Sequence, residues 1–327
     1  MVKTLTISIA AYNAAQYIRQ TLDSCLAEEV LDDLEIMVID DGGTDETAEI
    51  ARYYEQRYPG TVHFVHKENG GYGTTVNTSM ALATGKYFRL LDGDDWFDQN
   101  GLIKLVRYLK QCSADMVLTK MNCVYPDREV LADDTWKQFA GMETELSAFP
   151  KGAFAGMWEV TFLTEILHQH PFELPAHTLY TDHIFVMKTI PYIKTVACMD
   201  FPLYCYRLGN DGQSVSVGSR KKHVDEKIKV ARILCKYYHD KCRGIPNQEF
   251  ALERAKICYL ESFKDLLLLS CNYKNYQKMK QWDLELKNID VEIYHGVKSG
   301  RKAVNLFRKA GFVGYLLLKI RNHNRYN

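Results

Sequence analysis

Short apolar runs alternate with longer amphipathic stretches over the first hundred residues. Four of these runs have the length of buried strands: residues 5–9, 34–39, 62–65 and 87–91. The stretches between them have helix-like patterns: residues 15–29, 44–57 and 72–84. Buried strands that alternate with helices are typical of a parallel sheet. This part of the chain therefore predicts a doubly wound α/β fold.

The pattern is less regular beyond residue 100. Residues 102–112 predict a helix and residues 116–118 a strand, whereas residues 127–150 have no clean period and are expected to form loops. From about residue 221 the chain becomes helical, and residues 251–270 form a long stretch with one apolar face.

Polar or glycine-rich segments follow all four predicted strands. They are residues 10–13 (Ala-Ala-Tyr-Asn), 40–45 (Asp-Asp-Gly-Gly-Thr-Asp), 69–73 (Asn-Gly-Gly-Tyr-Gly) and 92–95 (Asp-Gly-Asp-Asp). In doubly wound sheets, ligands bind beyond the carboxyl ends of the strands. Four such segments at one edge predict a ligand site there.

The last of these segments places three carboxylates within four residues. Asp92, Asp94 and Asp95 repel one another unless a positive charge lies among them. A divalent cation bound together with a phosphorylated ligand suits such oxygen donors, and Gly93 allows the backbone to turn and approach a ligand. The alternative is an aspartate-rich turn that closes a strand. The cluster alone does not decide between the two.

Composition narrows the class of protein. A chain of 327 residues predicts one large or two unequal domains. Hydrophobic residues make up 46% and charged residues 25%, and equal numbers of basic and acidic residues argue against a nucleic-acid binder. The nine scattered cysteines indicate buried thiols in a reducing compartment. With no signal-peptide pattern and no apolar run of roughly 18 residues, we expect a cytoplasmic protein.

Five motifs, in this order, resemble family 2 glycosyltransferases of the GT-A fold. They are residues 10–13, 40–45, 68–71 (Glu-Asn-Gly-Gly), 83–87 (Ala-Thr-Gly-Lys-Tyr) and 92–96 (Asp-Gly-Asp-Asp-Trp). The resemblance implies a GT-A type doubly wound mixed sheet, with a Rossmann-like nucleotide-binding half and a C-terminal helical extension. We assign residues 1–218 to the transferase domain, of which 1–100 bind the nucleotide sugar and 101–218 the acceptor. Residues 219–327 form the helical region.

The resemblance also implies a nucleotide-sugar site, usually for a UDP-sugar. Asp41 would accept a hydrogen bond from the uracil ring, and Tyr12 with the Ala10 and Ala11 backbone would flank the base. Asp92 would face the ribose or the metal. Asp94, with Asp95 close by, would bind Mn²⁺ or Mg²⁺, which assists departure of the diphosphate. The other donor contacts implied are Asn13, Lys67, Asn69, Gly70, Gly71, Asn77 and Gly93.

Some of these assignments leave alternatives open. Lys67, Asn69 and Asn77 fit equally well as surface polar residues or as part of a helix-start turn. Family members often have Pro or Thr where this chain has Ala10, and Ser where it has Gly43. The donor sugar is therefore not fixed by the resemblance.

An inverting transferase needs a base that takes the proton of the acceptor hydroxyl. Residues 181–185 (Thr-Asp-His-Ile-Phe) are similar to the acid-acid-x-x-Phe segment of the family, which implies that Asp182 is the base. Thr181 replaces the first acid of that pair. From spacing alone, an aspartate before an apolar helix is more often an N-cap.

Two further residues are implied by weaker matches. Trp158 lies in a segment that resembles the start of the acceptor side and could stack on a sugar, with a core tryptophan as the alternative. Arg207 matches a Tyr-Arg pattern that closes over the donor diphosphate in the family, and a structural ion pair is its alternative.

The C-terminal tail is basic and apolar at once. Residues 293–327 contain no Asp or Glu, and lysines and arginines alternate there with large apolar residues. Such a stretch can bind the interface of an anionic bilayer, and many related enzymes use lipid-linked acceptors. A terminal helix packed on the domain, with a solvated basic face, is the alternative.

The leading hypothesis is an inverting, metal-dependent glycosyltransferase. It would move a sugar from a UDP-sugar to a saccharide or lipid-linked acceptor in the synthesis of bacterial cell-surface polysaccharide or glycolipid. The alternatives are a non-catalytic nucleotide-sugar binding or scaffold protein and a sugar-1-phosphate nucleotidyltransferase. The latter should carry a glycine-rich basic loop after the first strand, which residues 10–13 do not form. The acceptor, the linkage and the oligomeric state are left open.

Overall fold

The computed structural model describes residues 2–209, 213–298 and 302–326. The chain divides into two compact units, Met1–Gly209 and Asn210–Asn327. The separate roles given above to residues 1–100, 101–218 and 219–327 stay predictions.

Four parallel strands form the first half of the sheet in the N-terminal unit. They are β1 (Leu5–Ala11), β2 (Leu34–Asp40), β3 (Val62–His66) and β4 (Tyr87–Asp92), and they lie in the order β3-β2-β1-β4. All seven residues of β2 are buried, as expected for a strand covered on both faces. The four strands predicted from the apolar runs are thus confirmed.

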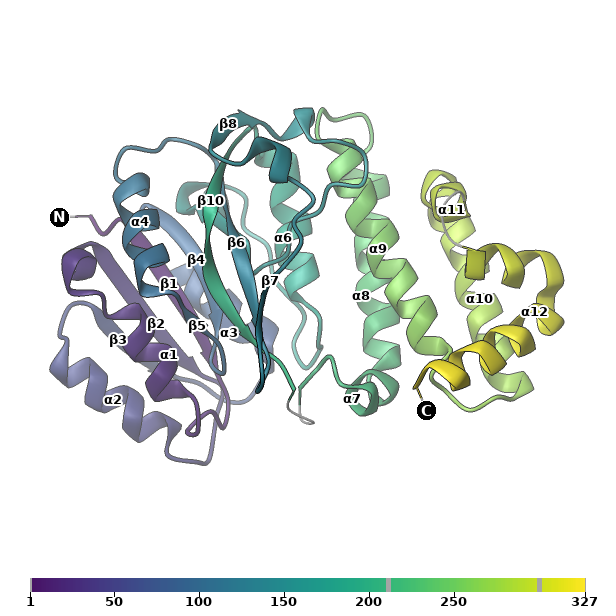
Figure 1. Ribbon diagram of the computed structural model, residues 1–327, viewed down its shortest axis with the longest axis horizontal. Coiled ribbons are helices and arrows are strands. Elements are labelled where there is room, and N and C mark those ends of the chain that lie inside the picture. Colours follow the sequence, from purple (N-terminus) through teal and green to yellow (C-terminus); the bar gives the residue numbers. More distant parts are fainter. Residues whose placement is uncertain (1, 210–212, 299–301, 327) are drawn as a thin grey trace. The chain divides into compact units, whose positions relative to one another are not determined.

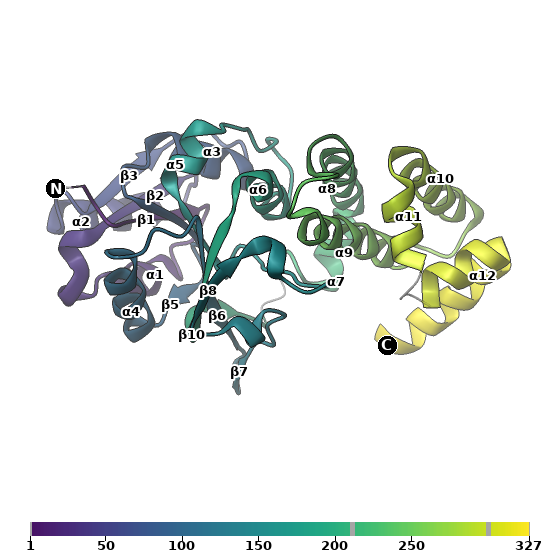
Figure 2. The same cartoon turned by 90° about the horizontal axis from the view of Figure 1, so that it is seen from above.

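Helices cover both faces of this sheet (Figures 1 and 2). On one face lie α1 (Ile18–Cys25), α2 (Thr47–Arg57) and α4 (Gln99–Leu109). On the other lie α3 (Tyr72–Leu82), α5 (Thr164–Gln169) and α6 (Asp182–Thr189). Right-handed crossovers between parallel strands produce this arrangement.

Two predicted helices have different bounds in the structure. The expected helix over residues 15–29 is in fact α1 followed by a 3₁₀ helix, Glu28–Asp33, and buried Ala27 and Val30 continue the apolar pattern across the break. Helix α4 begins three residues before the predicted start at residue 102, because the Asp98 side chain caps it by accepting from the Gly101 amide at 2.7 Å.

The sheet continues beyond β4 with mixed directions. The order is β4-β9-β6-β10-β5, where β9 (Val160–Leu163) is antiparallel to both β4 and β6 (Met116–Val124). Strand β10 (Thr195–Arg207) is parallel to β6, and β5 (Trp96–Phe97) closes the order. This is the mixed α/β sheet that was expected.

The prediction of loops for residues 127–150 was wrong in part. Strand β7 (Glu129–Leu131) pairs with β6, and β8 (Met142–Glu145) pairs with β10. Two 3₁₀ turns, Lys137–Phe139 and Leu146–Ala148, connect the rest. Because nearly every residue of β7 and β8 is exposed, no alternation of apolar and polar residues marks these strands in the sequence.

The C-terminal unit is helical, as predicted. Its helices are α7 (Val217–Lys222), α8 (Val224–Tyr237), α9 (Gln248–Leu266), α10 (Tyr273–Ile289), α11 (Val291–Lys298) and α12 (Lys302–Tyr326). Tyr259, Trp282 and Phe307 are buried in its core. Arg308 and Asp283 form a nearly buried ion pair at 2.6 Å.

Two further observations concern the whole of the described chain. None of its helices in residues 2–209, 213–298 and 302–326 combines the length and the apolar character needed to cross a membrane. Seven of the nine cysteines are buried, but Cys123 is half-buried and Cys271 is exposed, so the expectation of buried thiols fails at these two positions.

Candidate functional site

The carboxyl ends of the parallel strands meet at one edge of the sheet. In the strand register, Ala11 is opposite Asp40, Ala10 is opposite Asp92, and Asp40 is opposite His66. The segments that follow these strands therefore start side by side. This confirms the expected gathering of polar segments at a single edge.

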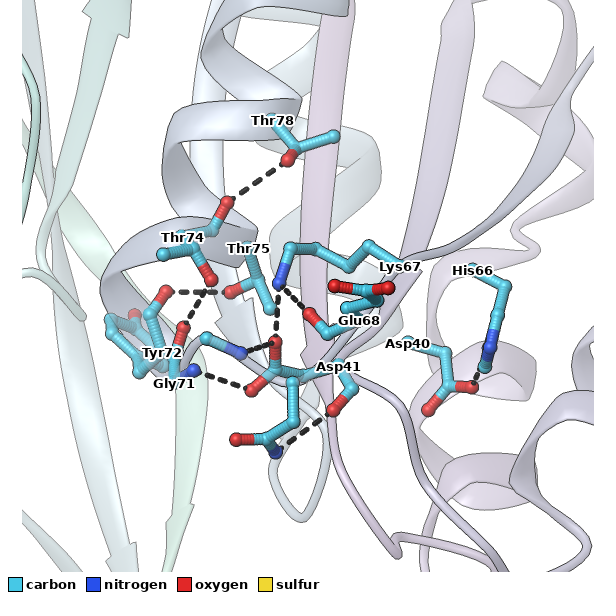
Figure 3. A network of polar contacts seen from close by, with 12 residues as sticks. Asp40, Asp41, His66, Lys67, Glu68, Gly71, Tyr72, Thr74, Thr75 and Thr78 are labelled. Atoms are coloured by element: carbon cyan, nitrogen blue, oxygen red, sulfur yellow. Dashed lines mark hydrogen bonds and ion pairs between the residues drawn. The ribbon is translucent and has the colours of Figure 1, made fainter. Parts of the chain in front are cut away.

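Asp41 is the centre of a hydrogen-bond network at this edge (Figure 3). Its Oδ1 accepts from the Lys67 Nζ at 2.6 Å and from the Gly70 amide at 2.9 Å, and its Oδ2 accepts from the Gly71 amide at 2.7 Å. The Asn69 side chain donates to the Asp41 carbonyl at 2.9 Å. The carboxylate is thus held by the segment after β3, and carboxylates of this kind retain lone pairs for a further donor.

The segment after β1 contributes one exposed ring and two supporting groups. Tyr12 is 56% exposed. Asn13 has a φ of 49° and accepts from the Thr44 amide through its Oδ1 at 2.8 Å, and the carbonyl of buried Ala11 accepts from the Asp41 amide at 2.9 Å. Ala11 and Asn13 therefore fix the segment after β2, while Tyr12 presents an aromatic surface to solvent.

The acid cluster is folded tightly against β1. The Gly93 amide donates to the Ala10 carbonyl at 3.0 Å, and a Cβ on Gly93 would lie 2.8 Å from that oxygen, so only glycine fits there. Asp92, Asp94 and Asp95 each bring a carboxylate oxygen within 4.8 Å of the others. The residues expected to bind a metal are therefore close enough to share one ion.

The Asp95 and Asp92 carboxylates differ in their hydrogen bonds to the protein. Asp95 is buried and accepts from the Tyr204 hydroxyl at 2.7 Å and from the Arg207 amide at 2.7 Å. Asp92 has a buried Oδ1 with no hydrogen-bond partner in the described part of the chain. A buried carboxylate oxygen without a donor is costly unless a ligand completes it.

Loss of hydration makes these acids hard to ionise. It raises the pKa of Asp95 to about 8, and the Asp94 charge adds to this effect. It also raises the pKa of Asp94, and it raises that of Asp92 well above its ordinary value, with the charges of Asp95 and Asp94 contributing. Crowded carboxylates, an orphaned oxygen and oxygen-only donors fit Mn²⁺ or Mg²⁺.

We expect the metal-free protein to become less stable as the pH rises from about 4 to about 8. In this window the folded chain keeps protons on the cluster that the unfolded chain has released, since the unfolded pKa of aspartate is about 4 and that of folded Asp95 is about 8. Thermal unfolding with a chelator present should show Tm decreasing as pH rises. The Asp92→Asn variant should show a shallower decrease, and an identical slope would contradict the assignment.

Arg207 lies against the cluster. Its guanidinium carbon lies 4.7 Å from the centroid of the Tyr17 ring and 4.6 Å from that of the Trp96 ring. Its Nε donates to the Asp94 carbonyl at 2.7 Å and its Nη2 to the Gln20 side chain at 2.6 Å. The guanidinium thus holds the backbone of the segment that carries Asp94. It also brings a positive charge to this edge, which would suit a diphosphate.

Asp182 is the first residue of α6 and is half-buried. Thr181, and not Asp182, occupies the N-cap position, so the capping alternative does not describe this aspartate. Its negative charge contributes to the raised pKa of Asp92, after burial and the other two acids. The candidate base therefore belongs to the same electrostatic site as the acid cluster.

Tyr72 was not singled out from the sequence, yet it belongs to the site. Its pKa is raised well above the ordinary value by burial and then by the charges of Asp92 and Asp182. Its buried hydroxyl makes no hydrogen bond of full geometry in the described residues, but it lies near enough to the Asp92 side chain for an interaction that also raises this pKa. The phenol at the first position of α3, directly after Gly71, therefore shares the site with Asp92.

Trp158 is half-buried and stacks on Tyr206, with ring centroids 6.3 Å apart and an interplanar angle of 9°. Its carbonyl accepts from buried Arg89, which also donates to the Thr161 hydroxyl at 2.8 Å. Burial lowers the pKa of Arg89 to about 9. Arg89 thus fixes the backbone beside Trp158, and the tryptophan is not an ordinary core residue.

Asn77 has a structural role in the described contacts. Its side chain donates to the Leu174 carbonyl at 2.9 Å and accepts from the Leu174 amide at 2.9 Å. The His177 amide also donates to the Gly70 carbonyl at 2.7 Å. Residues 174–177 are therefore joined to α3 and to the segment that holds Asp41.

Replacing Asn77 by alanine should lower the free energy of unfolding by about 2 kcal/mol, because two backbone groups of Leu174 lose their partners. Asn77→Asp is the matched variant, since it keeps the acceptor for the Leu174 amide and should lose less stability. Chemical denaturation measures both. Full stability of Asn77→Ala with weakened donor binding would instead support Asn77 as a donor contact.

Residues 6–164 match the family model described as Glycosyl transferase family 2. This match spans just under half of the chain, and over these residues the chain is similar to that family. The matched range runs from β1 into the start of α5, and it contains both the Asp41 network and the acid cluster. The resemblance expected from the five motifs is confirmed.

Proteins similar to this chain include EpsH of Bacillus subtilis (strain 168), named as a glycosyltransferase, and the hyaluronan synthase of Pasteurella multocida. EpsH is 24% identical over 211 residues, which are 62% of this chain and 60% of EpsH. The hyaluronan synthase is 33% identical over 141 residues, which are 42% of this chain and 14% of the synthase. The chain thus matches only part of each of these proteins.

Solved structures share the fold at low identity. The crystal structure of S. aureus TarS residues 1–349 has a TM-score of 0.68 at 15% identity and covers 99% of this chain and 93% of its own. The mannosyltransferase PcManGT from Pyrobaculum calidifontis has a TM-score of 0.55 at 16% identity, over 100% and 89% of the two chains. The expected GT-A type fold with C-terminal helices is confirmed.

Proposed function

We propose that this protein is an inverting, metal-dependent glycosyltransferase that uses a UDP-sugar donor. The observation that carries the proposal is the joint placement of Asp182 and the acid cluster at the carboxyl edge of the sheet, where the charge of Asp182 acts on Asp92. A base for the acceptor and a site for a metal and diphosphate then lie in one place. A binding module would have no need of this pairing.

The donor is proposed from the segment around Asp41 and from the neighbours. Exposed Tyr12 offers a stacking surface for a base, and Asp41 has remaining acceptor capacity for a ring N–H. TarS has been crystallised with UDP and with UDP-GlcNAc, and PcManGT with GDP-Man and Mn²⁺. These complexes support a nucleotide-sugar donor. We propose uracil as its base, with the ring N–H donating to Asp41.

Sugar transfer would proceed by in-line displacement. Asp182 takes the proton of the acceptor hydroxyl while that oxygen bonds to the anomeric carbon, and the bond from this carbon to the diphosphate oxygen breaks with inversion. Arg207 stabilises the negative charge of the departing diphosphate. Asp92, Asp94 and Asp95 would hold Mn²⁺ or Mg²⁺, which supplies Lewis-acid stabilisation of that leaving group when bound.

The acceptor would lie on the side of Trp158. Trp158 and Tyr206 are half-buried aromatic rings in a parallel arrangement. Burial and the charges of the cluster acids raise the pKa of Tyr206, which supports a place for this pair beside the acids. Aromatic faces suit sugar rings. We propose a saccharide or lipid-linked acceptor in bacterial cell-surface polysaccharide or glycolipid synthesis, on the cytoplasmic side of a membrane.

The direct test is turnover of UDP-, GDP- and dTDP-sugars with Mn²⁺, with Mg²⁺ and with a chelator. We expect hydrolysis or transfer from a UDP-sugar only when a metal is present. Turnover of a GDP-sugar instead would correct the base assigned to the Asp41 segment. Failure of every nucleotide sugar to bind, with either metal, would overturn the proposed function.

A further inference from the structure

The last part of α12 is apolar on two opposite faces. Gly314, Tyr315, Leu318 and Lys319 are buried on one face. The opposite face, called here the outer face, consists of Phe312, Val313, Leu316, Leu317 and Ile320, which are 37%, 61%, 36%, 49% and 62% exposed. These five positions recur at helical spacing and so form one stripe. A helix apolar on both faces normally has a partner on each.

The buried face, called the inner face, holds α12 in the C-terminal unit. Tyr315 packs against Tyr276 of α10, with ring centroids 5.7 Å apart, and the Lys319 Nζ donates to the Leu267 carbonyl at the end of α9 at 2.9 Å. Gly311 has a φ of 53° and breaks the helix before residue 312. Figure 2 shows α12, in yellow, with α10 and α11 beside it. Packing within the unit therefore uses the inner face, with Phe312 at its border against Tyr276, ring centroids 5.1 Å apart, and leaves Val313, Leu316, Leu317 and Ile320 exposed.

The outer face continues onto the start of α10. Tyr273 is 62% exposed and meets Phe312 edge to face, with centroids 5.7 Å apart. In the sequence around these positions, residues 266–282 and 293–327 contain no Asp or Glu. Lys274, Lys309 and Arg321 are exposed within them. The surface thus combines large apolar side chains with exposed cations from its own two elements, α10 and α12.

We propose that this surface, formed by the outer face with Tyr273, docks into the interface of an anionic lipid bilayer. The apolar side chains would enter the boundary between headgroups and acyl chains, and Lys274, Lys309 and Arg321 would meet the lipid phosphates. A second copy of the chain is a poor occupant, because a symmetric contact would bring these cations against one another. The inference stands independently of the sugar-transfer proposal.

The test is flotation of the full chain with vesicles of phosphatidylcholine, alone and mixed with phosphatidylglycerol. We expect binding to the anionic vesicles that weakens as salt is added. The double variant Leu317→Glu/Ile320→Glu should bind at least about tenfold more weakly. Arg321→Gln and Lys274→Gln should each weaken binding to the anionic vesicles by about fivefold. Leu284→Glu changes another exposed leucine, 49% exposed on α10 and outside this surface, and should bind normally.

Three results would overturn the proposal. They are no binding of the wild type to anionic vesicles, equal binding by the double variant, and a wild-type dimer in light scattering that the double variant abolishes without any vesicle binding. Circular dichroism of each variant separates a misfolded C-terminal unit from a true loss of docking. Because no nucleotide sugar is present in the assay, its outcome is distinguishable from failure of the proposed transferase activity.

Discussion

Asp182→Asn is expected to lower turnover by about 10²–10⁴-fold, the usual contribution of a general base, with little change in donor affinity. Asparagine keeps the size and polarity of the side chain, but it cannot take the proton of the acceptor hydroxyl. Thr181 occupies the N-cap position, so the helix does not depend on the Asp182 carboxylate as its cap. The measurement pairs initial rates with calorimetric titration of the donor in the presence of Mn²⁺.

Glu165→Gln is the matched control for this experiment. Glu165 is also an acid in the first turn of a short helix, α5, but it is exposed and accepts from Gln169 within that helix. It should keep full turnover, because a first-turn acid as such has no role in the chemistry. Wild-type rates in Asp182→Asn, or loss of donor binding with the rates, would remove Asp182 as the base.

Asp94→Ala is expected to abolish metal-dependent turnover, by about 10³-fold or more, since it removes one of three oxygen donors and the charge stabilisation that a metal provides. Asp94 is the informative position in the cluster. Asp95 accepts from Tyr204 and from the Arg207 amide, so its replacement would disturb the end of β10 as well. The described contact of Asp94 with Arg207 uses its carbonyl, which alanine retains.

Thermal unfolding with and without Mn²⁺ separates metal binding from folding in Asp94→Ala. A ligand that binds only the folded state raises Tm, so Mn²⁺ should stabilise the wild type and have no such effect on the variant. The metal-free Tm should stay at or above that of the wild type, because a half-buried acid has been removed. An unchanged Mn²⁺ response would show that the cation binds elsewhere.

The parallel half of the sheet could be predicted from the sequence because its strands are buried. Strands β1, β2 and β4 are buried on both faces, and their apolar runs are bounded by polar segments that also form the site. Asp41, Gly93 and Asp94 could therefore be placed at one edge from the order of strands and polar segments alone. The antiparallel pairing of β9 and the exposed strands β7 and β8 could not be predicted, because no such apolar run indicates them in the sequence.

The contacts that complete the site could not be predicted, because they join residues far apart in sequence. Tyr204 reaches Asp95 across 109 positions, and Arg89 reaches the Trp158 carbonyl across 69. Nothing in the sequence distinguishes Tyr72 from other residues at the start of a helix. Only its burial beside Asp92 and Asp182 marks it as part of the site. Residue type and spacing carry no information about such partners. Asn77 also bonds to Leu174 across 97 positions, and its contact with the donor stays a prediction.

The frame of the candidate donor site is built largely from peptide groups. Amides of Gly70 and Gly71 hold Asp41, and the Ala10 carbonyl holds Gly93. Peptide groups are the same in every residue, so most side chains around such a frame can drift during evolution while the frame persists, provided that the glycines and a few acids are kept. A fold with such a frame tolerates extensive change of side chains, and this chain and TarS share their fold at 15% identity with a TM-score of 0.68.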